Sequence, residues 1–238
     1  MSERPWLAHY PPGVPATLEY PEVTLDQFIE QSVAKHADLT ALRFATISMT
    51  YRELWGRVLR CAAALAELGI GKGDRVALLL PNCPQYVIAY FGTLRAGGIV
   101  VQVSPLSTPR ELVHHLSTSG AETIVVADVL YPVVQAVLPQ VNLRNVLVTR
   151  LRGEVTPGPE ARAFEEVLMS TTGAPPDVQV TPDDVAVLQY TGGTTGIAKG
   201  AMLTHRNLVV NVLQSAAPNP DFPSGADLRV LTVLPLFH

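Results

Sequence analysis

Four short apolar runs recur at nearly even spacing, and they constrain the fold more than any other feature of the chain. RVALLL, IVVQV, TIVVA and NVLVT start at residues 75, 99, 123 and 145, a spacing of 22 to 24 residues. These runs lack a clean polar alternation, which is typical of strands that are buried on both faces. Helical patterns lie between most of them. The sequence therefore predicts right-handed βαβ units and an α/β fold with largely parallel sheets and flanking helices.

Helix boundaries are indicated by capping residues. Thr24, Thr50 and Thr108 are each followed three residues later by Gln or Glu, a pattern that satisfies the first backbone amides of a helix. Gly69 is the expected C-cap of the second helix. Residues 150–182 break the pattern and predict a surface connection with one short helix near residues 164–169.

Three regions are expected along the chain. Residues 1–22 form a proline-rich, extended lead-in, and residues 23–182 a first α/β subdomain whose connection becomes irregular from about residue 150. Residues 183–238 start a second α/β subdomain, with a buried strand in DVAVLQY, a Thr/Gly-rich loop, a helix from about Thr204 and a buried strand in RVLTVLPLFH. Because the last strand reaches the final residue, we expect exposed strand edges that favour self-association or a homodimer.

Composition excludes several classes of protein. With 238 residues, 47% of them hydrophobic and 16% charged, the chain is long and apolar enough for a globular core. A net charge of −4 without a long basic run argues against nucleic-acid binding. The first residues lack the apolar core of a signal peptide, so we expect a cytoplasmic protein. The uncharged stretch 76–94 is divided by PNCPQ, which predicts a strand, a turn and a helix in place of a membrane span.

The cysteines and histidines offer weaker candidates. Cys61 and Cys83 are expected to be buried thiols, because they lack the spacing of a metal site or redox pair. HHLSTSG at residues 114–120 partly matches the paired-histidine motif of condensation-type acyltransferases, but Ser119 stands where that motif has aspartate. We therefore expect His114 and His115 on a helix surface. No histidine spacing predicts a metal site.

A glycine- and threonine-rich loop is the main candidate site. In YTGGTTGIAKGAMLTHRN, residues 190–207, glycines let backbone amides turn toward a ligand, threonines add hydroxyl donors and a lysine adds positive charge. The loop follows a predicted strand and is expected to open a helix, a place where parallel sheets bind anions. A P-loop is excluded, because Ala198 and Gly200 stand where that motif requires glycine and Ser or Thr.

Charged residues near predicted turns have simpler interpretations. His205 and Arg206 lie in the first turn of the helix expected after the loop, where a structural or phosphate-peripheral role is favoured over catalysis. Asp74 and Arg75 are interpreted as turn and surface charges.

The loop resembles the phosphate-binding signature of the adenylate-forming enzymes, the superfamily of acyl-CoA synthetases, luciferases and peptide-synthetase adenylation domains. Segments 73–97 and 100–121 and the terminal LPLFH also resemble family motifs, so the resemblance covers nearly the whole chain. Gly192, Ala198 and the YPPGVP start are similar to bacterial long-chain fatty acyl-CoA ligases. The resemblance implies an ATP-dependent, AMP-forming ligase that converts a fatty acid, through an acyl-adenylate, to an acyl-CoA thioester.

The resemblance also implies roles for particular residues. It assigns the triphosphate to the loop, with hydroxyl donors from Thr191, Thr194 and Thr195. The glycines serve as backbone donors and as sites of close approach: Gly192, Gly193, Gly196 and Gly200. Lys199 stabilises the departing pyrophosphate. Of these, Lys199 and Thr194 are the expected catalytic residues, and His238 is expected near the acyl pocket and the reacting carboxylate. ATP, Mg²⁺ and coenzyme A are the implied cofactors and cosubstrates.

Related enzymes are about twice as long as this chain, and their adenine, ribose, magnesium and coenzyme A sites lie downstream of LPLFH. We therefore expect an N-terminal fragment of a ligase that is inactive alone. Its partners are expected to be ATP, a fatty acid and coenzyme A, with peripheral membrane contact possible without a transmembrane segment. Three alternatives are a self-contained phosphotransferase, a non-catalytic partner-binding module, and a superfamily member that acts on another carboxylate.

Overall fold

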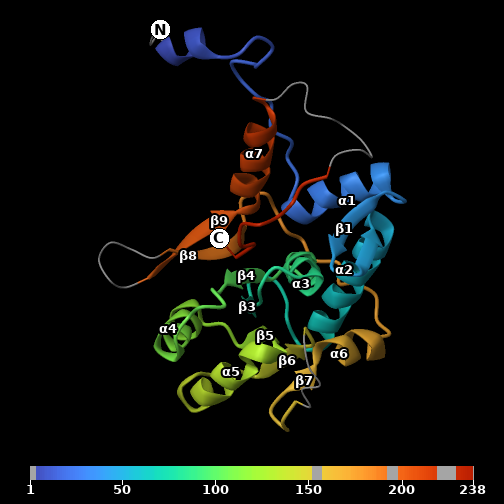
Figure 1. Cartoon of the computed structure of the whole chain (residues 1–238), viewed down its shortest axis with the longest axis vertical. Helices are drawn as coiled ribbons and strands as arrows, with labels where there is room; N and C mark the ends of the chain where they lie inside the picture. The colour runs from blue at the N-terminus through green and yellow to red at the C-terminus, as the bar shows by residue number, and fades with distance from the viewer. Residues whose placement is uncertain (1–3, 152–156, 192–197, 219–228, 238) are drawn as a thin grey trace.

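A single mixed sheet organises the protein. The computed structural model describes residues 4–151, 157–191, 198–218 and 229–237. Seven strands lie in the order β7-β6-β5-β3-β4-β8-β9 (Figure 1), and every neighbouring pair is parallel except β8 with β9. The strands are β3 Arg75–Leu79, β4 Ile99–Gln102, β5 Thr123–Ala127, β6 Asn145–Thr149, β7 Arg162–Ala163, β8 Val185–Thr191 and β9 Lys199–Thr204. The four predicted runs are β3 to β6, and the largely parallel α/β fold is confirmed.

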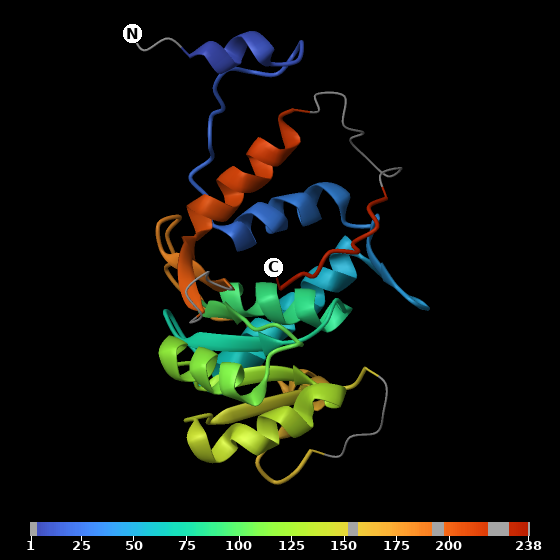
Figure 2. The ribbon, with the colours of Figure 1, turned by 60° about the vertical axis from the view of Figure 1, so that its left-hand side comes forward.

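Helices cover both faces of this sheet (Figure 2). The α-helices are α1 Leu25–His36, α2 Tyr51–Glu67, α3 Pro84–Arg95, α4 Pro109–Ser119, α5 Tyr131–Val137, α6 Phe164–Ser170 and α7 His205–Ala216, and short 3₁₀ helices are η1 Pro5–His9, η2 Asp128–Leu130 and η3 Leu138–Gln140. Val76 and Leu78 of β3 pack on the side of α2, α3 and α6. Ala77 and Leu79, on the opposite face, pack on the side of α4 and α5. Continuous apolar runs are needed because both faces of the strands are buried.

The predicted helix caps are present. The Thr50 hydroxyl accepts from the Glu53 amide and the Thr108 hydroxyl from the Glu111 amide, and the Thr24 amide donates to Gln27 Oε1. Gly69 has a φ of 88° just after α2, a conformation that favours glycine. The short helix near residues 164–169 is α6.

Both cysteines are buried free thiols, as expected. Burial raises the pKa of Cys61 to about 12 and the pKa of Cys83 to about 11, which leaves both thiols protonated at neutral pH. A Cβ on Gly92 of α3 would lie 2.6 Å from Cys61 Sγ of α2. Glycine at position 92 therefore leaves room for the Cys61 side chain between α2 and α3.

Two small features escaped prediction. A hairpin joins β1 Thr40–Phe44 to β2 Ile47–Thr50, with Ala45 at a φ of 49° in its turn, and β7 adds two residues to the sheet edge beside β6. Stretch 76–94 forms a strand, a turn and a helix as predicted, and no helix in the described ranges is long and apolar enough to cross a membrane.

The region around the glycine- and threonine-rich loop differs from the prediction. β8 is the predicted strand and α7 begins at His205, but residues 199–204 form β9, so the loop joins two antiparallel strands and does not open a helix. In the pairing of β8 with β9, Thr191 lies opposite Lys199 and Tyr190 lies opposite Gly200. β8 also pairs with β4. Residues 183–204 thus continue the main sheet, and the subdomain boundary near residue 183 stays a prediction.

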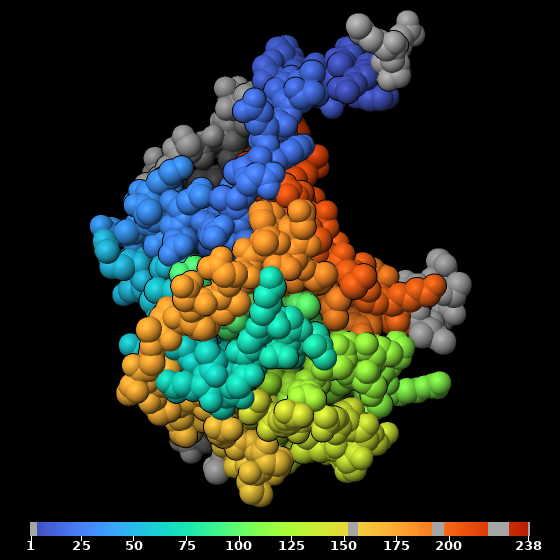
Figure 3. Space-filling model, turned by 180° about the vertical axis from the view of Figure 1, so that it is seen from behind, coloured from blue at the N-terminus to red at the C-terminus, as the bar shows by residue number. Residues whose placement is uncertain are grey.

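The expected last strand is wrong. Residues 229–237 are irregular, and Val230, Leu231, Val233 and Leu234 are 72% to 87% exposed. Residues 229–237 cannot pair with β4 or β8, because each of these strands already has a neighbour on both sides: β3 and β8 flank β4, and β4 and β9 flank β8. Two segments project from the body of the molecule: the lead-in near residues 4–22 and the β8–β9 hairpin (Figure 3).

Candidate active site

The carboxyl ends of β3, β4 and β8 converge under the irregular segment 232–237. In parallel sheets this edge is where ligands bind. Amide side chains follow the strands here: Asn82 lies three residues after β3, Gln102 ends β4, and Gln189 lies near the end of β8. Tyr86 joins them from the first turn of α3.

These side chains hold segment 232–237 by its backbone. Asn82 Nδ2 donates to the Leu234 carbonyl at 2.8 Å, and the Leu236 amide donates to Asn82 Oδ1 at 2.8 Å. Tyr86 Oη donates to the Leu236 carbonyl at 2.9 Å, and Gln189 Nε2 to the Phe237 carbonyl at 3.0 Å. Side chains thus replace the strand pairing that the apolar sequence predicts.

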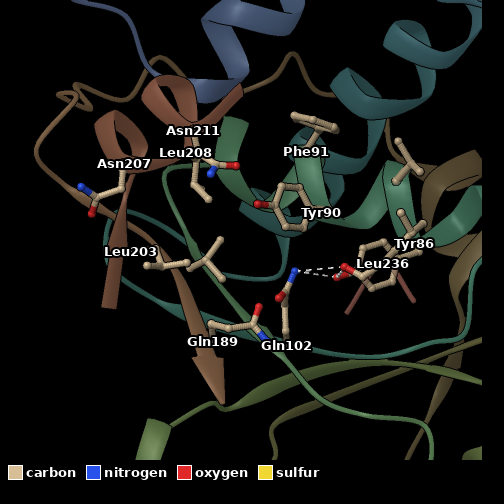
Figure 4. A pocket seen from close by; sticks show the side chains of 12 residues that line it. Tyr86, Tyr90, Phe91, Gln102, Gln189, Leu203, Asn207, Leu208, Asn211 and Leu236 are labelled. Carbon is tan, nitrogen blue, oxygen red and sulfur yellow. Dashed lines mark hydrogen bonds between the residues drawn. The ribbon is translucent and has the colours of Figure 1, made fainter. Parts of the chain in front are cut away.

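Two adjoining cavities flank this segment. The first, of about 570 Å³, is mainly apolar (Figure 4); its lining comprises Tyr86, Val87, Tyr90, Phe91, Gln102, Val187, Gln189, Leu203, Asn207, Leu208, Asn211 and Leu236. The second, of about 300 Å³, is more polar and is lined by Gln102, Ser104, Leu106, Ser107, Glu111, His115, Gln189, Tyr190, Thr191, Ala198 and Phe237. Gln102 and Gln189 line both cavities. Leu236 faces the apolar cavity, and Phe237 lines the polar one.

Gln102 is a buried polar side chain at the wall between the cavities. It is 7% exposed, and its Nε2 donates to Tyr86 Oη at 2.8 Å (Figure 4). Its Oε1 is buried and has no hydrogen-bond partner among the described residues. Burial raises the pKa of Tyr86 and Tyr90, so both phenols stay neutral. The wall can therefore accept a hydrogen bond without adding negative charge.

The described ends of the predicted phosphate loop border the polar cavity. Thr191 and Ala198 line it. Lys199 is exposed at the start of β9, directly across from Thr191. A Cβ on Gly200 would lie 3.3 Å from Tyr190 Cζ, so this glycine has a packing role across the strand pair. The predicted residues Gly192, Gly193, Thr194, Thr195, Gly196 and His238 lie outside the described residues.

The expectation that both histidines of α4 lie on the helix surface is wrong. His115 is only 6% exposed, and its ring lies 4.2 Å from the Tyr190 ring, centroid to centroid. His114 Nε2 lies 2.8 Å from the Ala198 carbonyl. The cause is the β8–β9 hairpin, which covers this side of α4. Burial, followed by the neighbouring His114, lowers the pKa of His115, so its imidazole is neutral at neutral pH.

The charged residues near turns have structural contacts. His205 is 1% exposed and its Nδ1 accepts from the Leu25 amide at 3.1 Å, while Arg206 forms ion pairs with Glu22 and Asp183. Both therefore join α7 to other parts of the fold.

Arg75 is not the surface charge that the sequence suggested. Its guanidinium is half-buried and donates to the carbonyls of Gly73, Ser119 and Gly120 at 2.9 to 3.0 Å. Asp74 accepts from the Gly71 amide at 2.9 Å and is a turn residue as expected.

Several site residues were missed from the sequence. Gln102 and Gln189 interrupt apolar runs near their carboxyl ends, and that position was an available signal for a ligand-facing side chain. Asn82 and Tyr86 carried no such signal, because their role depends on segment 232–237 folding back over the sheet. Within the described ranges, no group of three or more His, Cys, Asp or Glu side chains could hold a metal ion.

The carboxyl edge of a largely parallel sheet, a polar cavity beside the described ends of the predicted phosphate loop and an adjoining apolar cavity thus lie together in this fold. The model of the AMP-binding enzyme family matches residues 29–238. The chain belongs to this family of adenylate-forming ligases, and its sheet is part of the N-terminal domain of that fold.

Individual relatives agree with this assignment. The chain is similar to a long-chain-fatty-acid–CoA ligase of Escherichia coli, at 40% identity over 98% of this chain and 46% of the relative, and to one of Bacillus subtilis, at 37% identity over 100% and 46%. A solved long-chain-fatty-acid–CoA ligase from Archaeoglobus fulgidus superposes with a TM-score of 0.75 at 33% identity, covering 87% of this chain and 42% of that one. The chain thus spans less than half the length of these relatives.

Proposed function

We propose that this chain supplies the N-terminal part of an ATP-dependent, AMP-forming acyl-CoA ligase that acts on a long-chain fatty acid. The observation that carries the proposal is the pair of adjoining cavities: an apolar one of about 570 Å³ and a polar one at the ends of the phosphate loop. An acyl chain fits the first by chemistry, and the phosphates of ATP fit the second. The relatives named long-chain-fatty-acid–CoA ligases agree with an apolar cavity for an acyl chain beside a polar cavity for phosphates.

Gln102 and Gln189 line both cavities and therefore mark where the two cavities meet. A fatty acid with its chain in the apolar cavity would pass the wall formed by Gln102 and Gln189 and have its carboxylate oxygens in the polar cavity. One carboxylate oxygen attacks the α-phosphorus of ATP, the bond to pyrophosphate breaks, and an acyl-adenylate forms. The thiol sulfur of coenzyme A then attacks the acyl carbon, and AMP leaves.

Lys199 and the threonines of the loop are proposed to act on the triphosphate. Lys199 places a compact positive charge at the start of β9, opposite Thr191, where negative charge shifts onto the leaving pyrophosphate. Thr194, Thr195 and the loop glycines are proposed as further donors, and His238 as a residue near the carboxylate. Mg²⁺ is proposed to accompany ATP, without a ligand assigned among the described residues.

The test is a hybrid ligase in which residues 1–238 replace the matching part of the Escherichia coli relative. We expect ATP–pyrophosphate exchange that depends on palmitate and is much weaker with acetate or benzoate. Preference for an aromatic acid would reassign the carboxylate, and no exchange with any acid would favour a non-catalytic role. The chain alone is expected to show no acid-dependent exchange, because it spans less than half of its relatives.

We further infer a cytoplasmic protein that contacts membranes peripherally and self-associates. Exposed apolar side chains at Val230, Leu231, Val233 and Leu234 support the last point. Light scattering at increasing concentration tests it, and a monomer at all concentrations would contradict it.

A further inference from the structure

The β8–β9 hairpin needs support from outside the sheet. β9 is an edge strand whose sheet partner is β8, and residues 199–202 are exposed. Figure 1 shows the hairpin extending away from the other strands, with α4 beneath it. The described ends of the phosphate loop, Thr191 and Ala198, lie at this far end.

One support acts where the loop ends. His114 Nε2 lies 2.8 Å from the Ala198 carbonyl. A carbonyl only accepts, so this nitrogen carries the proton and donates. Ala198 directly precedes Lys199, the residue whose charge the proposed function uses. The hydrogen bond therefore fixes the backbone next to that lysine.

A second support acts where the loop starts. The His115 ring lies 4.2 Å from the Tyr190 ring with an interplanar angle of 39°. Tyr190 Oη also lies 2.6 Å from Thr118 Oγ1 and donates to the His115 carbonyl at 3.2 Å. The last turns of α4 thus hold the Tyr190 side chain at its ring and at its hydroxyl, one residue before Thr191.

The polar cavity connects both supports to the ligand site. His115, Tyr190, Thr191 and Ala198 all line it. His115 Nδ1 is buried and has no hydrogen-bond partner among the described residues, although buried polar atoms are usually paired.

We propose that His114 and His115 are positioning residues for the phosphate loop: His114 holds its end through the Ala198 carbonyl, and His115 holds its start through the Tyr190 ring. The functional importance of this position rests on the proposed ligase function, whereas the mechanical effect on the hairpin does not. The two can be tested separately.

The first test measures amide hydrogen exchange by mass spectrometry in residues 1–238. His114→Leu and His115→Ala should each accelerate exchange in peptides from β9 roughly fivefold or more, with β3 to β6 unchanged. His114→Gln keeps a donor and His115→Phe keeps an aromatic ring, so each should recover most of the protection. His36→Leu, in the last turn of α1, is the matched control and should not affect β9.

Two outcomes would overturn the positioning role. One is parental exchange in β9 for both His114→Leu and His115→Ala. The other is acceleration across the whole sheet with a lowered melting temperature, which would make the histidines general stabilisers of the fold.

A second measurement adds tripolyphosphate as the probe. The parent chain should gain protection in β9, and His114→Leu should lose most of that gain while His114→Gln keeps it. Equal protection in His114→Leu and the parent would count against the inference. Absence of protection in the parent would count against the proposed phosphate site, and the exchange comparison without ligand would then decide the positioning role alone.

Discussion

The inner strands and the β8–β9 hairpin use the same sheet in different ways. Val76, Val100 and Ile124, from three inner strands, are 0% exposed, whereas Met202 of β9 is 70% exposed. The inner strands are buried by helices on both faces. Ala186 and Val187 of β8 are buried in the same core, but the far end of the hairpin is held by polar contacts with α4 and by the His115–Tyr190 ring contact.

The inner strands and the hairpin are therefore expected to contribute differently, the first to the stability of the fold and the second to ligand binding. Burial of apolar side chains is the main stabilising contribution to a fold, and here it is concentrated in β3 to β6. The predicted ligand contacts lie at the carboxyl edge and in the hairpin, where amides, hydroxyls and imidazoles replace apolar packing. Substitutions in the two regions should therefore alter different measured quantities.

The largest expected effect on stability is in β3. Leu78→Ala removes a side chain that is 0% exposed and should lower the free energy of unfolding by about 2–5 kcal/mol, because it leaves a cavity in a close-packed core. Met202→Ala on β9 is the matched control and should change it by less than about 0.5 kcal/mol. Urea denaturation measures both. Similar losses for the two variants would contradict the division between core and hairpin.

The next expected effect is on rate. In the hybrid ligase, Lys199→Ala should slow single-turnover acyl-adenylate formation roughly 10²–10³-fold, because a charge that stabilises the leaving pyrophosphate is removed. Its melting temperature should stay at the parental value, since Lys199 is exposed. Adenylation at the parental rate would show that the loop acts through its glycines and threonines alone.

A smaller effect is expected where the hairpin meets α7. Thr204 caps this helix: its hydroxyl accepts from the Asn207 amide, and its own amide donates to Asn207 Oδ1 at 3.0 Å. Thr204→Ala should lower stability by about 1 kcal/mol with little change in adenylation rate, the reverse of Lys199→Ala. Thr204→Ser, which keeps the hydroxyl, is the control. A rate loss in Thr204→Ala at unchanged stability would place the cap within the site.

Local sequence patterns were sufficient for the core and for the helix caps. An apolar run buried on both faces and a Thr with Glu three residues later each depend on interactions within or next to the element. They predicted β3 to β6 and the starts of α1, α2 and α4. The phosphate-binding roles of Lys199 and Gly200 stay predictions, and the antiparallel pairing of β9 was not predicted from the sequence.

Features that depend on distant contacts were not predictable in this way. His115 is buried only because the hairpin lies over α4, and Arg75 is half-buried only because the end of α4 lies beside β3. The run 229–237 has a strand-like composition, but its hydrogen-bond partners are Asn82, Tyr86 and Gln189, some fifty to one hundred and fifty residues away. No periodicity within the run carries that information.

The last expected effect appears only below neutral pH and concerns His205, which stands at the border between the hairpin and the helical layer. Burial lowers its pKa from 6.5, although Asp26 and Asp184 act in the opposite direction. The unfolded chain therefore binds a proton near pH 6.5 that the folded chain does not, and stability should fall as the pH drops from about 7.5 to about 5.5, by at most about 1.4 kcal/mol per pH unit for this group. His205→Asn keeps an acceptor for the Leu25 amide and should flatten this slope. Urea denaturation across the pH range provides the comparison. An unchanged slope in His205→Asn would mean that other groups, His115 first among them, carry the pH dependence, and that the hairpin contributes more to it than the junction with α7.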